Sequence, residues 1–136
     1  MNASALMVDD WVLFSGEPKR VRSIAVSDDN RVERIYVFGN TCQVSTINDY
    51  IQPIPLTPEI LENNGFEYND ENARYYPNCW QKNGILLRKR TFNGFFYMVT
   101  VDYNNQDTNC TPIIITYVHE LQHLLKLCRI EQQIEL

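Results

Sequence analysis

The sequence has few of the residues that usually build cofactor and nucleotide sites. It contains five glycines, four cysteines and two histidines in 136 residues. The glycines form neither a phosphate-binding loop nor a Gly-x-Ser-x-Gly nucleophile turn. No two cysteines are spaced as a Cys-x-x-Cys pair, which excludes the common short zinc and dithiol motifs and predicts four reduced thiols. From these patterns we expect no cofactor.

Positive charge and long apolar runs are also scarce. Twelve Lys and Arg against 17 Asp and Glu give a net charge of −5, the wrong sign for holding nucleic-acid phosphates without sequence specificity. The longest apolar runs, such as Phe95–Val99, are far shorter than the ~20 residues of a membrane helix. The first residues lack the basic start and apolar core of a secretory signal. We therefore expect a cytoplasmic protein with no membrane partner.

The first third of the chain alternates short β-type runs with turn residues. At 136 residues and 44% apolar composition, the chain fits one compact domain or two small ones. The spacing of the runs predicts an SH3-like small β-barrel over residues 1–56. Val21 breaks the alternation set by Ile24 and Val26, which predicts a β-bulge near Ser23. The expected strands are Trp11–Phe14, Lys19–Val26, Arg31–Phe38 and Cys42–Thr46.

A proline-rich stretch follows and predicts a boundary. Three prolines within residues 53–58 remove backbone donors, so Ile51–Leu56 is expected to be an edge strand or an extended connector. Thr57 suits an N-cap, Pro58 suits the first helical position, and Gly65 suits the left-handed residue that ends a helix. These residues predict a short helix over Thr57–Asn64.

The remainder predicts an α+β subdomain over residues 57–136, packed with the barrel as one unit. Asn83-Gly84 and Asn93-Gly94 are strong hairpin signals because both residue types tolerate positive φ. They lie between runs that are expected to form an antiparallel sheet. A closing helix is expected over Thr116–Arg129. The expected strands are Phe66–Tyr68, Tyr75–Gln81, Ile85–Arg90 and Phe95–Tyr103.

The closing helix carries His119-Glu120-Leu121-Gln122-His123, which matches the zinc-peptidase pattern His-Glu-x-x-His. Two imidazoles one helical turn apart can chelate Zn²⁺ while the glutamate activates water. On a helical wheel, however, both histidines fall opposite the apolar arc, so we expect His119 and His123 to face water. The extended signature is also missing, because Lys126 and Arg129 stand where glycine and histidine are required.

The same wheel predicts which side chains stabilise the helix. Leu121→Ala is expected to cost about 2–5 kcal/mol as a core truncation. His123→Ala is expected to cost within about 0.5 kcal/mol as a surface change. The wheel places four side chains in the core: Leu121, Leu124, Leu125 and Cys128.

Three further patterns offer alternatives. Arg88-Lys89-Arg90 beside Phe92 suggests contact with single-stranded nucleic acid through Arg88, Arg90 and Phe92. A second basic cluster, Lys19-Arg20-x-Arg22, lies in the expected barrel. Residues 102–107 resemble part of a calcium loop but lack its glycine and final glutamate, which favours a hairpin loop. Cys79-Trp80 resembles the Cys-Trp pair of papain-like proteases without the preceding Cys-Gly-x, so a buried strand cysteine is favoured.

The stretch Ile51–Phe66 and the segment Tyr117–Leu124 resemble small uncharacterised proteins of gut Bacteroidetes and of their prophages and mobile elements. In those proteins the helix reads more like Tyr-x-His-x-Leu-Gln-Asn-Leu, so Glu120 and His123 are departures in this chain. The resemblance covers most of the chain and implies a fold and a genomic setting, without an activity. It further disfavours a zinc site.

The sequence therefore predicts a non-enzymatic binding or accessory protein that is phage- or mobile-element-related and acts on a protein partner. The first alternative is a zinc-dependent hydrolase with Glu120 as catalytic residue and His119 and His123 as metal ligands. The second alternative is single-stranded nucleic-acid binding.

Overall fold

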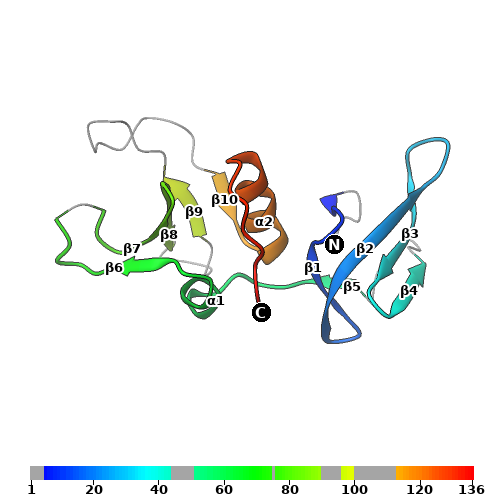
Figure 1. Ribbon diagram of the computed structural model, residues 1–136, viewed down its shortest axis with the longest axis horizontal. Coiled ribbons are helices and arrows are strands. Elements are labelled where there is room, and N and C mark those ends of the chain that lie inside the picture. The colour runs from blue at the N-terminus through cyan, green and yellow to red at the C-terminus, as the bar shows by residue number, and fades with distance from the viewer. Residues whose placement is uncertain (1–4, 44–50, 75, 90–95, 100–112) are drawn as a thin grey trace. The chain divides into compact units, whose positions relative to one another are not determined.

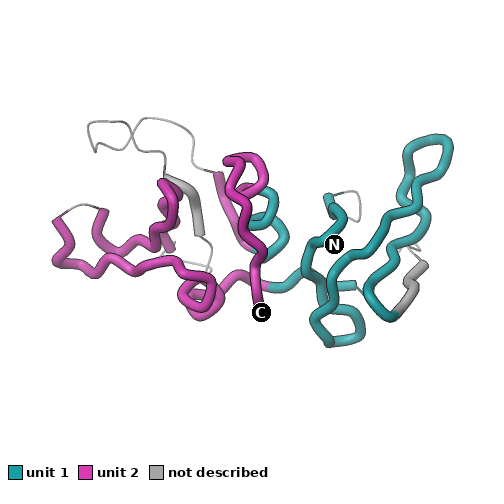
Figure 2. Tube along the Cα trace, in the orientation of Figure 1, with its two compact units in different colours: residues 1–54, 117–123 teal, residues 55–116, 124–136 magenta. Residues whose placement is uncertain are grey.

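The structure is a computed structural model that describes residues 5–43, 51–74, 76–89, 96–99 and 113–136 (Figure 1). Antiparallel sheets and two helices give it the expected α+β class. The chain divides into two compact units, each made of two segments (Figure 2). One unit comprises Met1–Ile54 and Tyr117–His123, and the other comprises Pro55–Thr116 and Leu124–Leu136.

The first unit contains a five-stranded antiparallel sheet with the order β4-β3-β2-β1-β5. Strands are present at all four positions predicted for this region, and residues 44–46 of the fourth predicted strand lie outside the described residues. Tight turns such as Ser15-Gly16, where both residues have positive φ, join consecutive strands. The strands are β1 (Trp11–Phe14), β2 (Glu17–Val26), β3 (Val32–Val37), β4 (Asn40–Gln43) and β5 (Ile51–Pro53).

The core of this sheet lies on one face and follows the alternation of the strands. The pairing of β2 with β3 shifts register between Val21 and Ser23, where the sequence predicted a bulge. The shift lets β2 keep apolar side chains inside on both sides of the irregularity. The buried cluster consists of Leu6, Val12, Val21, Ile35, Val37 and Ile51.

The proline-rich stretch forms the expected edge strand and helix start. β5 lies at one end of the sheet order, where Pro53 removes no donor needed by a further strand. Helix α1 (Pro58–Asn63) begins after Thr57, whose Oγ1 accepts a hydrogen bond from the Ile60 amide at 3.3 Å. Its C-cap is Asn64, and Gly65 follows with a left-handed φ of +83°. Both ends are as predicted.

The second unit contains another five-stranded antiparallel sheet, ordered β10-β9-β8-β7-β6. Asn83 and Gly84, with φ of 49° and 82°, form the predicted hairpin turn between β7 and β8. Cys79 is fully buried on β7, as expected for a strand cysteine. The Asn93-Gly94 turn and residues 102–107 lie outside the described residues. The strands are β6 (Glu67–Asn69), β7 (Cys79–Lys82), β8 (Ile85–Lys89), β9 (Phe96–Val99) and β10 (Ile113–Ile115).

The side chain of Asn64 binds the C-terminal tail within this unit. Its side-chain amide donates to the Glu135 carbonyl at 2.8 Å and accepts from the Glu135 amide at 2.7 Å. Its own carbonyl accepts from Lys82 Nζ at 2.7 Å. These bonds hold the tail next to α1, and Ile134 of the tail is buried.

Helix α2 (Val118–Leu127) is two residues shorter at each end than expected. Arg129 adopts φ +55°, and the Ile130 amide donates to the Leu125 carbonyl at 2.9 Å, the bond that closes a Schellman cap. Leu121, Leu124 and Leu125 are buried as predicted. The prediction for Cys128 was wrong: it is exposed, because the chain has already left the helix at that residue.

Candidate functional sites

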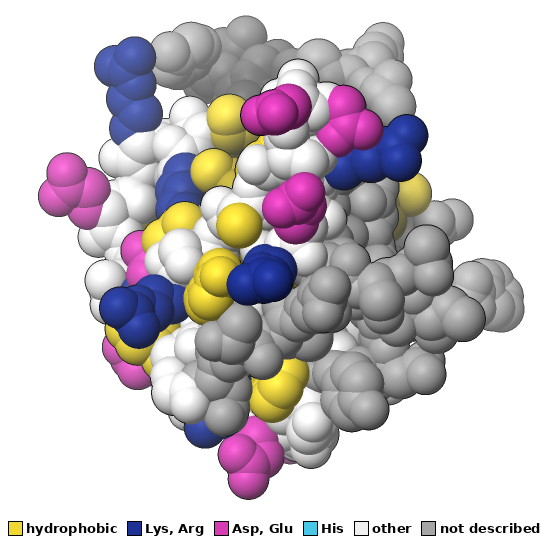
Figure 3. Space-filling view, turned by 90° about the vertical axis from the view of Figure 1, so that its right-hand side faces the viewer, with side chains coloured by type: hydrophobic (Ala, Val, Ile, Leu, Met, Phe, Trp, Pro, Cys, Tyr) yellow, Lys and Arg dark blue, Asp and Glu magenta, His cyan; other side chains and the backbone are white. Residues whose placement is uncertain are grey.

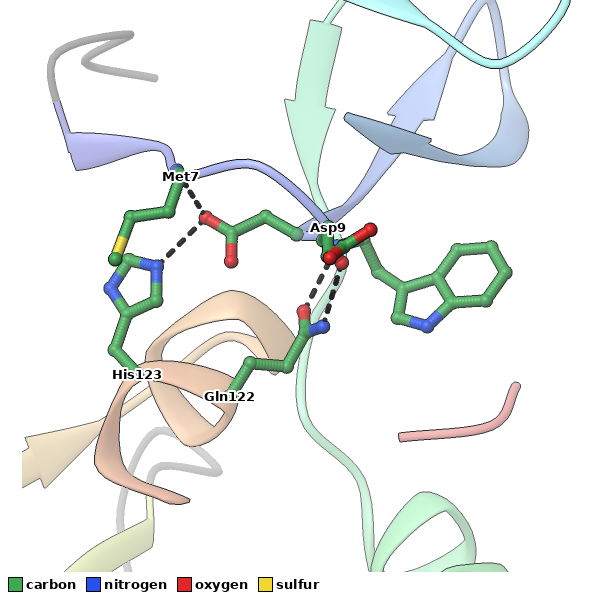
Figure 4. Close-up of polar contacts among 6 residues, drawn as sticks. Met7, Asp9, Gln122 and His123 are labelled. Carbon is green, nitrogen blue, oxygen red and sulfur yellow. Dashed lines mark hydrogen bonds and ion pairs between the residues drawn. The ribbon is translucent and has the colours of Figure 1, made fainter. Parts of the chain in front are cut away.

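The polar side of α2 is bound to the segment Met7–Trp11 within the first unit (Figure 4). His123 Nε2 lies 2.8 Å from Asp10 Oδ2, and the same oxygen accepts from the Met7 amide at 2.7 Å. Gln122 makes two bonds to the backbone, accepting from the Trp11 amide and donating to the Asp9 carbonyl, both at 2.9 Å. We call this set of contacts the N-terminal clamp.

The N-terminal clamp overturns the expected exposure of both histidines. His119 is only 4% exposed, and the His123 side chain is 24% exposed. A helical wheel assigns the face opposite the apolar arc to water. Here that face is covered by a segment more than a hundred residues earlier in the chain, held by polar bonds that amphipathicity does not reveal.

His119 lies between two rings and near a buried carboxyl group. Its imidazole stacks on Tyr117 with ring centroids 5.8 Å apart and meets the His123 ring edge-on at 5.7 Å. Burial lowers the pKa of His119, and the charges of Asp10 and Glu120 partly oppose that effect. His119 Nδ1 and Asp10 Oδ1 are both buried and have no hydrogen-bond partner among the described residues. Burial therefore favours the neutral form of this imidazole.

Glu120, the glutamate of the zinc-peptidase pattern, points back along its own helix. Its Oε2 accepts a hydrogen bond from the Tyr117 amide at 3.1 Å, which is half of a capping box. The imidazole of His123 is bound to Asp10 instead of pointing to a shared position with His119. Within the ranges that the structure describes, no group of three or more His, Cys, Asp or Glu side chains is placed to hold a metal ion.

The opposite face of the first sheet carries a pocket that sequence reasoning missed. It has a volume of about 310 Å³ and is lined by Trp11, Pro18, Lys19, Arg20 and Phe38. We call it the aromatic pocket. Strand alternation could have revealed it. Val12, Val21 and Val37 are buried, so the residues next to them in the chain, Trp11, Arg20 and Phe38, are expected on the opposite face of the sheet.

Arg20 lies at the centre of this pocket. Its Nη2 donates to Asp9 Oδ1 at 2.9 Å, and its Cζ lies 6.0 Å from the centroid of the Trp11 ring, within reach of a cation–π contact. Phe38, which lines the pocket together with Trp11 and Arg20, is 52% exposed. Figure 3 shows hydrophobic side chains exposed among charged side chains of both signs on the face turned toward the viewer.

The basic strand proposed for nucleic acid is only partly described. Arg88 is half-buried on β8 and is the register partner of Cys79 and Tyr97. Arg90 and Phe92 lie outside the described residues. Contact with nucleic acid through these three residues therefore stays a prediction.

No helix among the described residues is long and apolar enough to cross a membrane. Comparison with known protein families, with curated proteins and with solved structures finds no match to this chain. The geometry of the N-terminal clamp and of the aromatic pocket is therefore what a functional proposal must rest on.

Proposed function

We propose that this protein is a non-enzymatic binding module that recognises a protein partner through the aromatic pocket. The observation that supports the proposal is an apolar surface that stays exposed on the first unit. It is separate from the buried cluster that forms the core of that unit. Trp11 and Phe38 flank Arg20, and Pro18 extends the surface along β2. Tryptophan and arginine are among the side chains that most often dominate binding energy at protein interfaces, and phenylalanine is enriched there.

The size of the aromatic pocket favours a protein ligand over a cofactor. Its ~310 Å³ lies at the low end of the ~300–1,000 Å³ of small-molecule pockets and is open at the surface. Such a hollow accommodates one or two side chains of a partner. The Arg20 guanidinium is already oriented by Asp9, which reduces the entropy lost on binding.

Three finer points belong to the same proposal. The first unit is an SH3-like small barrel, as the strand spacing over residues 1–56 suggests. The protein works in the cytoplasm, as the lack of a secretory-signal pattern in its first residues suggests. It belongs to a prophage or mobile element, as the resemblance of Ile51–Phe66 and Tyr117–Leu124 suggests. All three rest on sequence patterns alone.

The test is an unbiased peptide-display library selected on the full-length protein. Enriched peptides are then measured against two variants that remove similar exposed apolar side chains from the same unit. Phe38→Ser removes one wall of the aromatic pocket, and Val26→Ser is the matched control, because both wild-type residues are 52% exposed and Val26 lies outside the pocket. We expect Phe38→Ser to weaken binding about tenfold or more, and Val26→Ser to leave it nearly unchanged.

Two results would contradict the proposal. One is the absence of any enriched peptide, or peptides that bind both variants equally well. The other is stoichiometric zinc in protein purified without a histidine tag and lost in His119→Ala, which would favour the zinc-dependent hydrolase.

A further inference from the structure

The chain contains three Asn-Gly pairs, and two of them lie among the described residues. Asn64-Gly65 follows α1, and Asn83-Gly84 forms the turn between β7 and β8. In an Asn-Gly pair the backbone nitrogen of the glycine can approach the side-chain carbonyl carbon of the asparagine, because glycine has no side chain that obstructs the approach. The two described pairs therefore share one latent reaction and differ in their surroundings.

The Asn83-Gly84 pair lies open to water. Both residues are exposed, and a Cβ placed at Gly84 would meet nothing within 4 Å. No other described residue forms a hydrogen bond with the Asn83 side chain. Bringing the Asn83 amide to the Gly84 nitrogen disturbs only the end of the hairpin, where Lys82 pairs with Ile85. Little of the described structure therefore opposes the reaction at this turn.

The Asn64-Gly65 pair is held by hydrogen bonds at both of its reacting groups. Asn64 is only 6% exposed. Its Nδ2 donates to the carbonyls of Ile60 at 2.7 Å and Glu135 at 2.8 Å, and its Oδ1 accepts from the Glu135 amide at 2.7 Å. The Gly65 nitrogen donates to the Glu62 carbonyl at 3.1 Å. The same reaction at this pair would first have to break these bonds.

We infer that Asn83 is a site of spontaneous deamidation in the folded protein, and that the fold protects Asn64 from the same reaction. The Gly84 nitrogen loses its proton to a solvent base and forms a bond to Asn83 Cγ. The bond between Cγ and the side-chain nitrogen breaks and releases ammonia, which leaves a cyclic imide. Water then opens the imide at either carbonyl, and the products are aspartate and isoaspartate, each with one new carboxylate.

The reaction changes the charge of a pocket next to the hairpin. This pocket has a volume of about 490 Å³, and Asn83 and Gly84 line it together with Glu67 and Lys82, whose charges cancel. A carboxylate at position 83 leaves the pocket with a net negative charge. The age of the molecule is thereby recorded in the charge of this pocket.

The experiment follows the full-length protein during incubation in mildly alkaline buffer. Peptide mapping by mass spectrometry reports conversion at positions 64 and 83 separately, and the same protein in concentrated urea is the control. In the folded protein we expect Asn83 to react faster than Asn64 by roughly a hundredfold, since each hydrogen bond shifts an equilibrium about fivefold and three of them hold the Asn64 amide. In urea the two rates should become similar.

Two variants place the carboxylate directly at each position. Aspartate accepts positive φ much as asparagine does, so Asn83→Asp should leave the midpoint of thermal unfolding almost unchanged. Asn64→Asp should lower the midpoint, because a carboxylate would face the carbonyl oxygens of Ile60 and Glu135 in place of two N–H donors.

Three results would overturn the inference. One is equal conversion of Asn64 and Asn83 in the folded protein. Another is conversion of Asn83 in urea alone, which would mean that the native hairpin prevents the reaction. The third is an equal fall of the unfolding midpoint in the two aspartate variants, since the bonds of Asn64 would then protect nothing.

Discussion

Removing the His123 imidazole is the sharpest test of the N-terminal clamp. As a surface residue, His123 could be replaced by alanine at a cost within about 0.5 kcal/mol. In the structure its Nε2 lies 2.8 Å from the carboxylate of Asp10, which is fully buried. Among the described residues, His123→Ala would leave that carboxylate with only the Met7 amide.

The expected magnitude follows from these contacts. A hydrogen bond to a charged group contributes about 1.5–3 kcal/mol, and removing one partner of a fully buried pair costs about 3–5 kcal/mol. The His123 ring retains some contact with water, so the lower part of this span applies. We expect the free energy of unfolding to fall by about 2–3 kcal/mol.

The assay is a urea titration followed by tryptophan fluorescence. The chain has two tryptophans, Trp11 in the first unit and Trp80 in the second, so a Trp80→Phe background makes the signal report on the first unit. Leu127→Ala is the control on the same helix, because Leu127 is 80% exposed. It should change stability by no more than about 0.5 kcal/mol.

A double-mutant cycle with Asp10→Ala isolates the pair. The two substitutions share one interaction, so their coupling energy should be on the order of 2 kcal/mol. A loss in His123→Ala no larger than that in Leu127→Ala, or a coupling energy near zero, would show that the N-terminal clamp contributes nothing and that the helix face is solvated after all.

Other predictions concern the core, a titrating group and a strained turn. Leu121→Ala should destabilise the first unit by about 2–5 kcal/mol in the same titration, because the side chain is fully buried. The pKa of His119 is lowered below its ordinary value of 6.5 in the folded protein. As the pH drops through and below about 6.5, the unfolded chain therefore binds a proton that the folded chain does not bind, and the free energy of unfolding should fall. His119→Gln should flatten that loss between about pH 7.5 and about pH 5.5; an unchanged slope would show that other groups cause it. Gly65→Ala should cost more than Gly16→Ala, although both have φ +83°, because a Cβ at 65 would lie 2.8 Å from Lys82 Nζ and one at 16 would meet nothing within 4 Å. Equal shifts in thermal unfolding would mean that Lys82 moves aside freely.

The parts of the fold that sequence could predict are those governed by neighbours in the chain. Thr57, Pro58 and Gly65 set the two ends of α1 through their own backbone preferences. Asn83-Gly84 sets a hairpin because both residues accept positive φ. No distant residue is needed for either feature, which is why both were located correctly.

The misjudged features depend on residues far away in the sequence. His119 is buried although it lies opposite the apolar arc of its helix. The bonds of Gln122 and His123 to Met7–Trp11 join residues more than a hundred positions apart, and the periodicity of the helix does not reveal them. β10 is only three residues long, so its sequence looks like any short apolar run. It is a strand because it pairs with β9, which the local sequence does not show. The aromatic pocket could have been predicted from the sequence, since strand alternation places Val12 on the core face and Trp11 on the opposite face.

The division of the first unit into two segments has a consequence for synthesis on the ribosome. Residues 1–54 emerge first, but Gln122 and His123, which complete the N-terminal clamp, belong to the far side of residues 55–116. At ~5–20 residues per second, synthesis of residues 55–123 takes roughly 3–14 s, during which the Asp10 carboxylate and the Trp11 amide lack these partners. A fragment that stops at the proline-rich stretch is held permanently in that state. Expression of the first unit alone therefore requires a shortened chain in which the segment Tyr117–His123 is rejoined to Ile54 by a short linker.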